Sequence, residues 1–118
     1  MLNEAAVERV YLALGNTDLR KSIDGLAVIV KEVFELDPFS PCLFVFCNRQ
    51  RDKLKILHWD RNGFWLYYRR LERGKFQWPS EGRATPVKVS RRELRWLLDG
   101  LAIEQKQAHQ EVTARTII

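Results

Sequence analysis

The feature that most constrains the fold is a pair of aromatic-rich segments joined by an Asn-Gly dipeptide. The segments KLKILHWD (53–60) and FWLYYRRL (64–71) lie on either side of Asn62 and Gly63. Asn and Gly accept the positive φ angles of a type I′ turn, and such a turn suits two strands that follow each other directly. The pattern therefore predicts an antiparallel hairpin.

Two registers are open for this hairpin. A two-residue loop pairs Trp59 with Leu66, and a four-residue loop pairs Trp59 with Phe64. Both give the same two faces, because side chains alternate along a strand. One face carries Lys53, Lys55, Leu57, Trp59, Phe64, Leu66, Tyr68 and Arg70. The other carries Leu54, Ile56, His58, Asp60, Trp65, Tyr67, Arg69 and Leu71.

Further strands are predicted on both sides of the hairpin. VERVYLAL (7–14) is rich in β-forming residues, and the apolar run CLFVFC (42–47) is typical of a strand buried on both faces near the centre of a sheet. A turn at 72–74 returns the chain through KFQWP (75–79), and 80–89 is expected to be a loop with at most one short strand. The middle of the chain is therefore predicted to be an antiparallel meander.

One long N-terminal helix is predicted after the first strand. Its apolar stripe consists of Ile23, Leu26, Ala27, Val30, Val33 and Phe34. These positions repeat at three- and four-residue steps, as on one face of a helix. Ser22 is a suitable N-cap, Thr17 or Asp18 could open an earlier turn, and Pro38 ends the helix.

A shorter C-terminal helix is predicted in SRRELRWLLDGL. Ser90 and Glu93 have the spacing of a capping box, and Gly100 can end or kink the helix. Its apolar stripe is Leu94, Leu97, Leu98 and Leu101. Residues 104–118 have weak periodicity and are expected to be a helical extension or disordered.

The predicted fold class is α+β. Residues 1–103 form a single domain, in which a small antiparallel β meander packs against the long N-terminal helix and the shorter C-terminal helix. With helices on one side of the sheet, only one face of the hairpin is buried. A basic and aromatic surface is then expected to stay open.

Positive charge is concentrated in the middle of the chain. The whole sequence has a net charge of +5, whereas residues 49–75 contain nine Arg and Lys against three Asp and Glu. A concentrated field of this kind attracts polyanions. DNA is accordingly the expected partner.

The binding hypothesis assigns phosphate contacts to basic residues and base stacking to rings. The expected phosphate ligands are Arg49, Arg51, Lys53, Lys55, Arg61, Arg69, Arg70 and Arg73, and the expected stacking rings are Trp59, Trp65 and Tyr67. Two other interpretations stay open. The rings could fill the core while Arg and Lys stems cover its edges, or the surface could dock a protein or a second copy of the chain.

Other classes of function have little support in the sequence. The chain has no Gly-rich phosphate loop, nucleophile elbow or HExxH motif, so we expect no enzyme. Cys42 and Cys47 are five residues apart, which on a strand places them on opposite faces, and neither histidine has a paired ligand spacing. We expect buried thiols, no metal and no cofactor. No apolar run is long enough to span a membrane, so a cytoplasmic protein is expected.

The segment TDLRKSIDG is predicted to open the first helix. Asp18 and Asp24 favour the positive end of a helix dipole, and Arg20 or Lys21 can pair with them. A phosphate-binding helix start is the alternative, although the two carboxylates argue against it.

Three blocks of the sequence resemble a known family. LALGNTDLRKSIDGLAVIV, LFVFCNRQRDKLKILHWDRNGFWLYYRRLERGKFQWP and LRWLLDGLAI together are similar to the transposition accessory proteins of the IS66 group of bacterial insertion sequences. These are the products of the second open reading frame, often labelled TnpB, and they are not to be confused with the RNA-guided nucleases of that label, which are several times longer. The resemblance spans about residues 7–103.

The resemblance implies a non-catalytic accessory protein for transposition. A separate, longer transposase of the same element then supplies the cutting and joining chemistry. The resemblance brings no catalytic residues with it, but it implies contact with DNA, for which the basic aromatic hairpin is the candidate surface. Docking of the transposase is the alternative, and homo-oligomers are possible.

Overall fold

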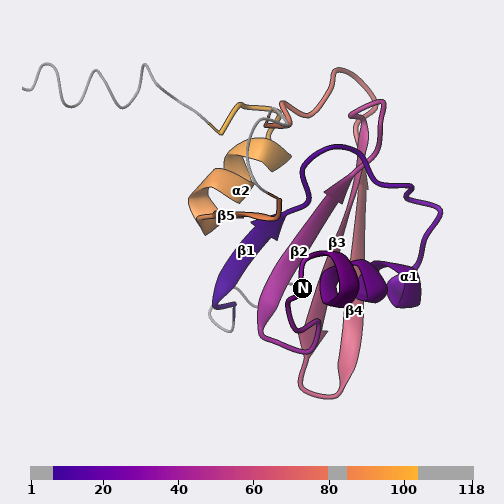
Figure 1. Cartoon of the computed structure of the whole chain (residues 1–118). Coiled ribbons are helices and arrows are strands. Elements are labelled where there is room, and N and C mark those ends of the chain that lie inside the picture. The colour runs from indigo at the N-terminus through magenta and orange to yellow at the C-terminus, as the bar shows by residue number, and fades with distance from the viewer. Residues whose placement is uncertain (1–6, 80–84, 104–118) are drawn as a thin grey trace, which may run out of the picture.

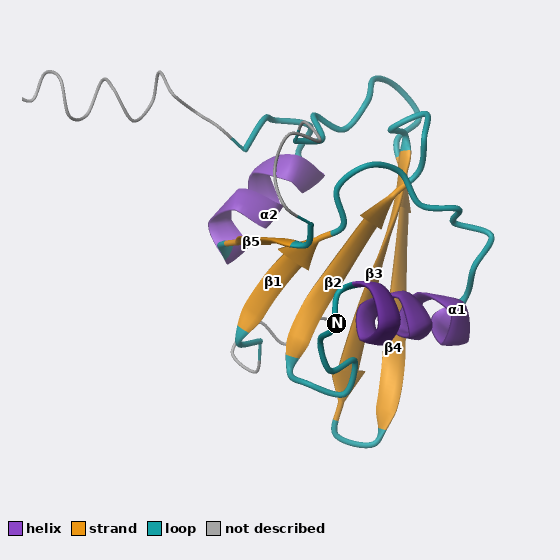
Figure 2. Ribbon diagram, in the orientation of Figure 1, coloured by secondary structure: helices purple, strands orange, loops and turns teal. Residues whose placement is uncertain are grey.

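The computed structural model describes residues 7–79 and 85–103, and these form a five-stranded sheet with helices packed on it (Figures 1 and 2). The strand order across the sheet is β4-β3-β2-β1-β5. Along the chain the elements are β1 (Arg9–Leu12), α1 (Ile23–Val28), η2 (Ile29–Val33), β2 (Cys42–Cys47), β3 (Lys53–Asp60), β4 (Gly63–Arg70), β5 (Val87–Val89) and α2 (Arg91–Leu98).

The sheet is mixed, which corrects the prediction of a simple antiparallel meander. The segment from β2 through β3 to β4 is antiparallel, as predicted. However, β1 pairs with β2 in parallel, and the chain between them contains α1 and η2. The short β5 then pairs antiparallel with β1. The chain thus begins with a strand–helix–strand unit, and a parallel connection of this kind needs a crossover segment.

The helices cover opposite faces of the sheet, whereas helices on one side were expected. Leu26 and Val30 pack with Phe44, Phe46 and Leu57 on one face. On the other face, α2 places Leu94 and Leu97 in a cluster with residues of the first three strands. In Figure 2, α1 lies in front of the sheet near β3 and β4, and α2 lies beside β1 and β5. Each helix covers only part of its face.

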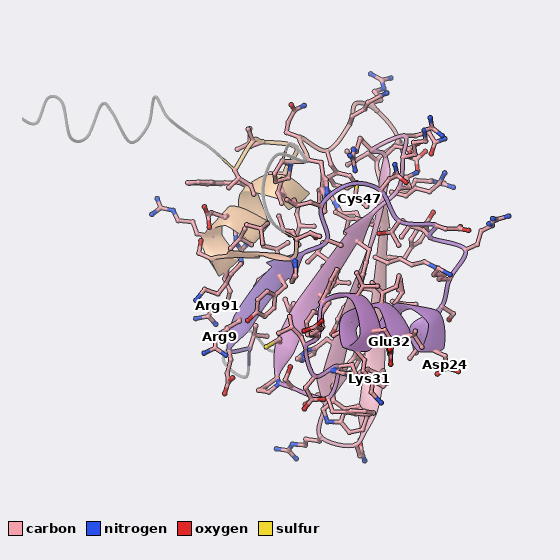
Figure 3. The ribbon with its side chains drawn as sticks, in the orientation of Figure 1. Arg9, Asp24, Lys31, Glu32, Cys47 and Arg91 are labelled. Atoms are coloured by element: carbon pink, nitrogen blue, oxygen red, sulfur yellow. The ribbon has the colours of Figure 1, made fainter. Side chains whose placement is uncertain are left out.

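The N-terminal helix is shorter than predicted. It spans 11 residues, six in α1 and five in the π-helical segment η2. The N–H of Phe34 donates to the carbonyl of Ile29, a five-residue step, and Glu35 then adopts a left-handed φ of 58°. The chain therefore leaves the helix three residues before Pro38. On its outer side the helix carries the exposed Asp24, Lys31 and Glu32 (Figure 3).

Both ends of α2 follow the predicted signals. The Ser90 hydroxyl accepts from the Glu93 N–H at 3.0 Å, and the Glu93 carboxylate accepts from the Ser90 N–H at 2.7 Å. Gly100 follows the helix with a φ of 84°. Because the helix ends at Leu98, Leu101 leaves the predicted apolar stripe and is 46% exposed.

The hairpin between β3 and β4 has a different turn from the one predicted. Asp60 pairs with Gly63 and Trp59 pairs with Phe64, the second of the two expected registers. The turn residues are Arg61 and Asn62, and the positive φ of 61° falls on Arg61, as at the first central position of a type II′ turn. The alternation of faces along both strands is as predicted.

Strand β2 lies at the centre of the sheet and is buried along its whole length, as predicted. Cys42 belongs to the core cluster beside α1, and Cys47 belongs to the cluster beside α2. Both thiols are free and buried, on opposite faces. The segment 75–79, through which the chain was expected to return after the turn, forms no strand. It runs as irregular chain that buries Phe76 in the α2-side cluster.

Candidate nucleic-acid interface

A groove opens on the α1 face of the sheet, at the end that the helix leaves uncovered. Its volume is about 760 Å³. The floor comes from β3 and β4, one wall from the loop 16–20 and the other from the turn 48–50. The lining residues are Asn16, Thr17, Asp18, Leu19, Arg20, Asn48, Arg49, Gln50, Lys53, Lys55, Leu66 and Tyr68.

The floor is built from cross-strand pairs of the hairpin. Lys55 lies opposite Tyr68, and Lys53 lies opposite Arg70, so cations and a ring alternate on one face. The Tyr68 side chain is 54% exposed, and the Lys55 ammonium lies 6.0 Å from its ring centroid. An exposed aromatic ring therefore lies among positive charges in an open groove.

The loop wall is held to the sheet by hydrogen bonds from two predicted site residues. Lys55 Nζ donates to the carbonyls of Leu19 and Lys21, at 2.7 and 3.1 Å. Arg51 Nη1 donates to the carbonyl of Gly15 at 2.7 Å. Both side chains donate these hydrogen bonds within the protein. Arg51 and Lys55 therefore stabilise the shape of the groove more than they bind a ligand.

The end of β2 anchors both walls. The Thr17 N–H donates to the carbonyl of Cys47 at 2.9 Å, which ties the loop to the strand end that Figure 3 marks with Cys47. In the opposite turn, the Asn48 side-chain oxygen accepts from the N–H groups of Asp52 and Lys53. Its amide nitrogen also donates to Asp52 Oδ1 at 2.8 Å. Hydrogen bonds within the protein thus hold both walls of the groove.

The groove carries an excess of positive charge. Arg20, Arg49, Lys53 and Lys55 face one lining carboxylate, Asp18. Hydrogen bonds from Arg20 hold the pKa of Asp18 well below its usual range, so the carboxylate is ionised and paired. The excess is therefore three positive charges, which favours an anionic ligand.

Arg49 and Lys53 are the cations of the groove with the least internal engagement. Arg49 is exposed and forms no ion pair with any residue that the structure describes. The Lys53 ammonium has a weak ion pair with the Asp52 carboxylate, because the 4.0 Å between them is the outer limit for such a contact. Hydrogen bonding from Asn48 lowers the pKa of Asp52, which keeps that carboxylate charged and tied to its own turn.

Three predicted site residues lie on the opposite face. Trp65, Tyr67 and Arg69 project from β4 toward the α2 side. The Trp65 and Tyr67 rings are stacked, with centroids 6.0 Å apart and planes at 16°. Trp65 is 50% exposed, whereas Tyr67 is half-buried against the core, and that burial raises the pKa of its hydroxyl. These rings cannot share a ligand-binding groove with Lys53 and Lys55.

The remaining predicted residues lie around the ends of the hairpin. Trp59 packs edge-on against Phe39 and Phe64, both with centroids 4.9 Å away, at the tip beside Arg61. At the other end, Arg70 donates to the Glu72 carboxylate at 2.9 Å, and this bond raises the pKa of Arg70. Arg73 is exposed in the following bend. The eleven predicted residues therefore do not form one surface.

Sequence reasoning did not select Tyr68 or Arg20 for the site. Tyr68 shares the strand face of Lys53 and Lys55, and this parity was the signal that could have identified it. Arg20 was predicted to pair with a carboxylate, and its bond of 2.8 Å to Asp18 confirms that pairing. Its place in the lining of the groove depends on the path of the loop, which the sequence pattern did not indicate.

No other chemical site is evident in the part of the chain that the structure describes. Within residues 7–79 and 85–103, no three His, Cys, Asp or Glu side chains cluster as metal ligands would. Over the same residues, no helix has the length and apolar character needed to cross a membrane. The buried His58 has its Nδ1 atom 3.3 Å from the Cys42 carbonyl and faces the core.

Comparison with known proteins places the chain in a family. The profile of the family described as "IS66 Orf2 like protein" matches residues 8–108. The Uncharacterized protein y4hO of Sinorhizobium fredii (strain NBRC 101917 / NGR234) is 41% identical over 102 residues, which cover 86% of this chain and 87% of that protein. From the same organism, the Uncharacterized protein y4jC is 34% identical over 71 residues, covering 60% and 61% of the two chains. No solved structure matches.

The family match covers the whole sheet, α1, α2 and the walls of the groove. It agrees with the resemblance found in the three sequence blocks. The chain belongs to the IS66 Orf2 like protein family, and this family connects it with an insertion sequence.

Proposed function

We propose that this chain is a non-catalytic accessory protein of insertion-sequence transposition and that it binds DNA through the groove on the α1 face. One observation carries the proposal: four cations and the exposed ring of Tyr68 line an open groove, and Asp18 is the one acidic residue among its described lining residues. Phosphates are the anionic groups of DNA, and cationic side chains bind them with release of counterions. Membership of an insertion-sequence family is consistent with contact with DNA, because an insertion sequence is a DNA element.

The groove assigns the predicted phosphate ligands different roles. We assign phosphate contact to Arg49, which forms no ion pair with a described residue, and to Lys53, whose ammonium lies 4.0 Å from the Asp52 carboxylate. Arg20 extends from the loop with its side chain 91% exposed. Arg51 and Lys55 hold the wall in place instead. Binding through a preformed groove avoids the cost of ordering a loop on association.

Titration of the purified protein with labelled DNA at several salt concentrations tests the proposal. We expect the logarithm of the binding constant to fall linearly with the logarithm of the salt concentration. The double variant Arg49→Gln/Lys53→Gln should bind more weakly, and its salt slope should be smaller by about 2, since each lysine or arginine on phosphate contributes about 1.

A matched double variant separates a local contact from a loss of net charge. Lys31→Gln/Lys88→Gln removes the same charge from the exposed side of η2 and from β5, away from the groove. We expect a smaller loss of affinity and an unchanged slope. Absence of binding at low salt, or a slope that both double variants reduce equally, would contradict the proposal.

Docking of the transposase is a second candidate function, favoured by a different surface. The stacked Trp65 and Tyr67 lie on the α2 face, and Trp65 is half exposed. Tryptophan and tyrosine are enriched at the energetic centres of protein interfaces. The apolar stripe of α2 contributes less to such an interface, because Leu94 and Leu97 are buried in the core.

Co-purification with the transposase of the same element in high salt tests this second function. High salt weakens phosphate contacts, whereas an aromatic anchor in a pocket persists. We expect Trp65→Ala to reduce the recovered complex and Tyr68→Ala to leave it unchanged. Failure of the wild-type proteins to co-purify in both low and high salt would count against docking.

A further inference from the structure

We infer that the groove takes single-stranded DNA, with an unpaired base stacked on Tyr68 and the flanking phosphates on Arg49 and Lys53. This inference rests on the proposed function and adds the class of DNA to it. It assigns the stacking contact to a ring on the groove floor, on the opposite face of β4 from Trp65.

The position of Tyr68 is the first reason. The ring is 54% exposed on the groove floor beside Leu66, so an apolar and aromatic surface is open between charged walls. In a duplex the bases are stacked on each other and only their edges face the grooves, whereas an unpaired base offers its whole face to a ring. A ring recessed between two walls therefore adds binding energy for a single strand and little for a duplex.

The size of the groove is the second reason. About 760 Å³ lies within the range of roughly 300–1,000 Å³ that is typical of sites for small organic molecules. A space of that size accommodates a base with its sugar. The loop 16–20 and the turn 48–50 bound it on two sides, which favours a narrow and flexible single strand over a rigid duplex.

The distribution of charge is the third reason. Lys53 lies on the floor two residues before Lys55, the cross-strand partner of Tyr68, and Arg49 lies on the turn above it. Cations on one side of a ring suit a strand whose phosphates run along the wall while a base turns inward. Single-strand binding sites commonly combine such a basic track with a stacking ring.

Three DNA ligands of identical length distinguish the possibilities: a single strand, its blunt duplex, and the same strand with abasic sites in place of bases. We expect wild-type protein to bind the single strand more tightly than the duplex. We expect Tyr68→Ala to weaken single-strand binding by about 5- to 150-fold, the range for loss of one stacked base, and to leave duplex binding unchanged. Wild-type protein should bind the abasic strand as weakly as Tyr68→Ala binds the intact strand.

Two variants control for the ring and for its face. Tyr68→Phe keeps the ring and should keep the affinity for the single strand. Trp65→Ala removes a ring of similar exposure from the other face of β4 and should also leave it unchanged. Urea unfolding midpoints of all variants show whether the fold persists. We expect it to persist, because Tyr68 is exposed.

The outcomes separate this inference from the proposed function. Equal or tighter binding of the duplex, or equal single-strand affinity of wild-type protein and Tyr68→Ala, overturns the inference and leaves phosphate binding by the groove intact. Binding of neither single strand nor duplex at low salt overturns both.

Discussion

The ammonium group of Lys55, on strand β3, donates a hydrogen bond of 2.7 Å to the main-chain carbonyl of Leu19 in the loop before α1. A second bond of 3.1 Å goes to the carbonyl of Lys21. One charged side chain thus joins the floor of the groove to its wall. A cation that the sequence suggested as a phosphate ligand therefore has a structural role.

Replacement of Lys55 by methionine tests this role. Lys55→Met keeps the aliphatic stem but leaves two carbonyls without their charged donor. We expect the free energy of unfolding to fall by about 1.5–3 kcal/mol in urea denaturation, the range for hydrogen bonds to charged groups. Amide exchange at Thr17, whose N–H bonds to the Cys47 carbonyl, should become faster as the loop loosens.

Lys75→Met is the matched control, since Lys75 is exposed in the irregular segment after Gly74. Substitutions at such surface positions usually change stability by less than about 0.5 kcal/mol. Equal losses in the two variants would show that the bonds from Lys55 do not hold the loop.

Local sequence signals predicted correctly those elements for which the tertiary packing favours the same structure as the local pattern. The apolar run 42–47 became the central strand, and parity placed Cys42 and Cys47 on opposite faces. Ser90 and Glu93 formed their capping box because both partners lie within one turn of chain. In these places the local preference and the tertiary packing favour the same structure.

Tertiary packing decided the features that sequence reasoning missed. The strand–helix–strand order of residues 9–47 permits a parallel pair, but the prediction extended the antiparallel meander to β1. In the hairpin, Asn62-Gly63 favoured one turn, yet the edge-on packing of Trp59 on Phe64 accompanies the other register. Side-chain packing across strands outweighs the preference of two turn residues.

The groove could not be predicted because it depends on what α1 leaves uncovered. The apolar stripe predicted a helix up to Phe34 but not which end of the sheet the helix would cover. The groove wall comes from residues 16–20, which the sequence suggested as a helix start. The prediction that Lys53, Lys55 and Tyr68 share one face of the hairpin was correct. The path of the loop 16–20 was not predicted.

The two N-cap serines should respond differently to substitution. Ser90→Ala removes the bond to the Glu93 N–H, so we expect a loss of about 1 kcal/mol in the free energy of unfolding. Ser22, the N-cap of α1, makes no side-chain cap bond, and Ser22→Ala should have little effect. Chemical denaturation of both variants measures the difference, and equal losses would refute the role of the capping box.

The glycine that ends α2 should tolerate substitution less than the glycine that opens β4. Gly100 has a φ of 84°, and its N–H donates to the Leu97 carbonyl while the Leu101 N–H donates to the Trp96 carbonyl, as in a Schellman motif. Gly100→Ala should therefore cost about 1 kcal/mol of stability. The control Gly63→Ala adds a methyl group where no atom lies within 4 Å, and Gly63 does not have a positive φ.

Thermal or urea unfolding compares these glycine variants. We expect the midpoint for Gly100→Ala to fall clearly below that of wild-type protein, and the midpoint for Gly63→Ala to stay close to it. A loss for Gly63→Ala that equals or exceeds the loss for Gly100→Ala would show that the positive φ of Gly100 is not what makes its substitution costly.

The pair formed by Asp18 and Arg20 should make stability depend on pH in the acid range. Hydrogen bonds from Arg20 depress the pKa of Asp18 in the folded protein below its ordinary value of 3.8. A depressed pKa contributes stability above pH 3.8, and that contribution declines as the pH falls from 3.8 toward the lower folded pKa. Asp18→Asn removes it, so the stability difference between wild-type protein and Asp18→Asn should shrink below about pH 4.

A double-mutant cycle isolates the pair from other acid-sensitive groups. Free energies of unfolding of wild-type protein, Asp18→Asn, Arg20→Gln and the double variant give the coupling between the two side chains at each pH. We expect a favourable coupling near neutral pH that declines in the acid range and weakens in about 1 M salt, since both side chains are solvent-exposed. A coupling that stays constant as the pH falls below 3.8 would show that the Asp18 carboxylate is not its source.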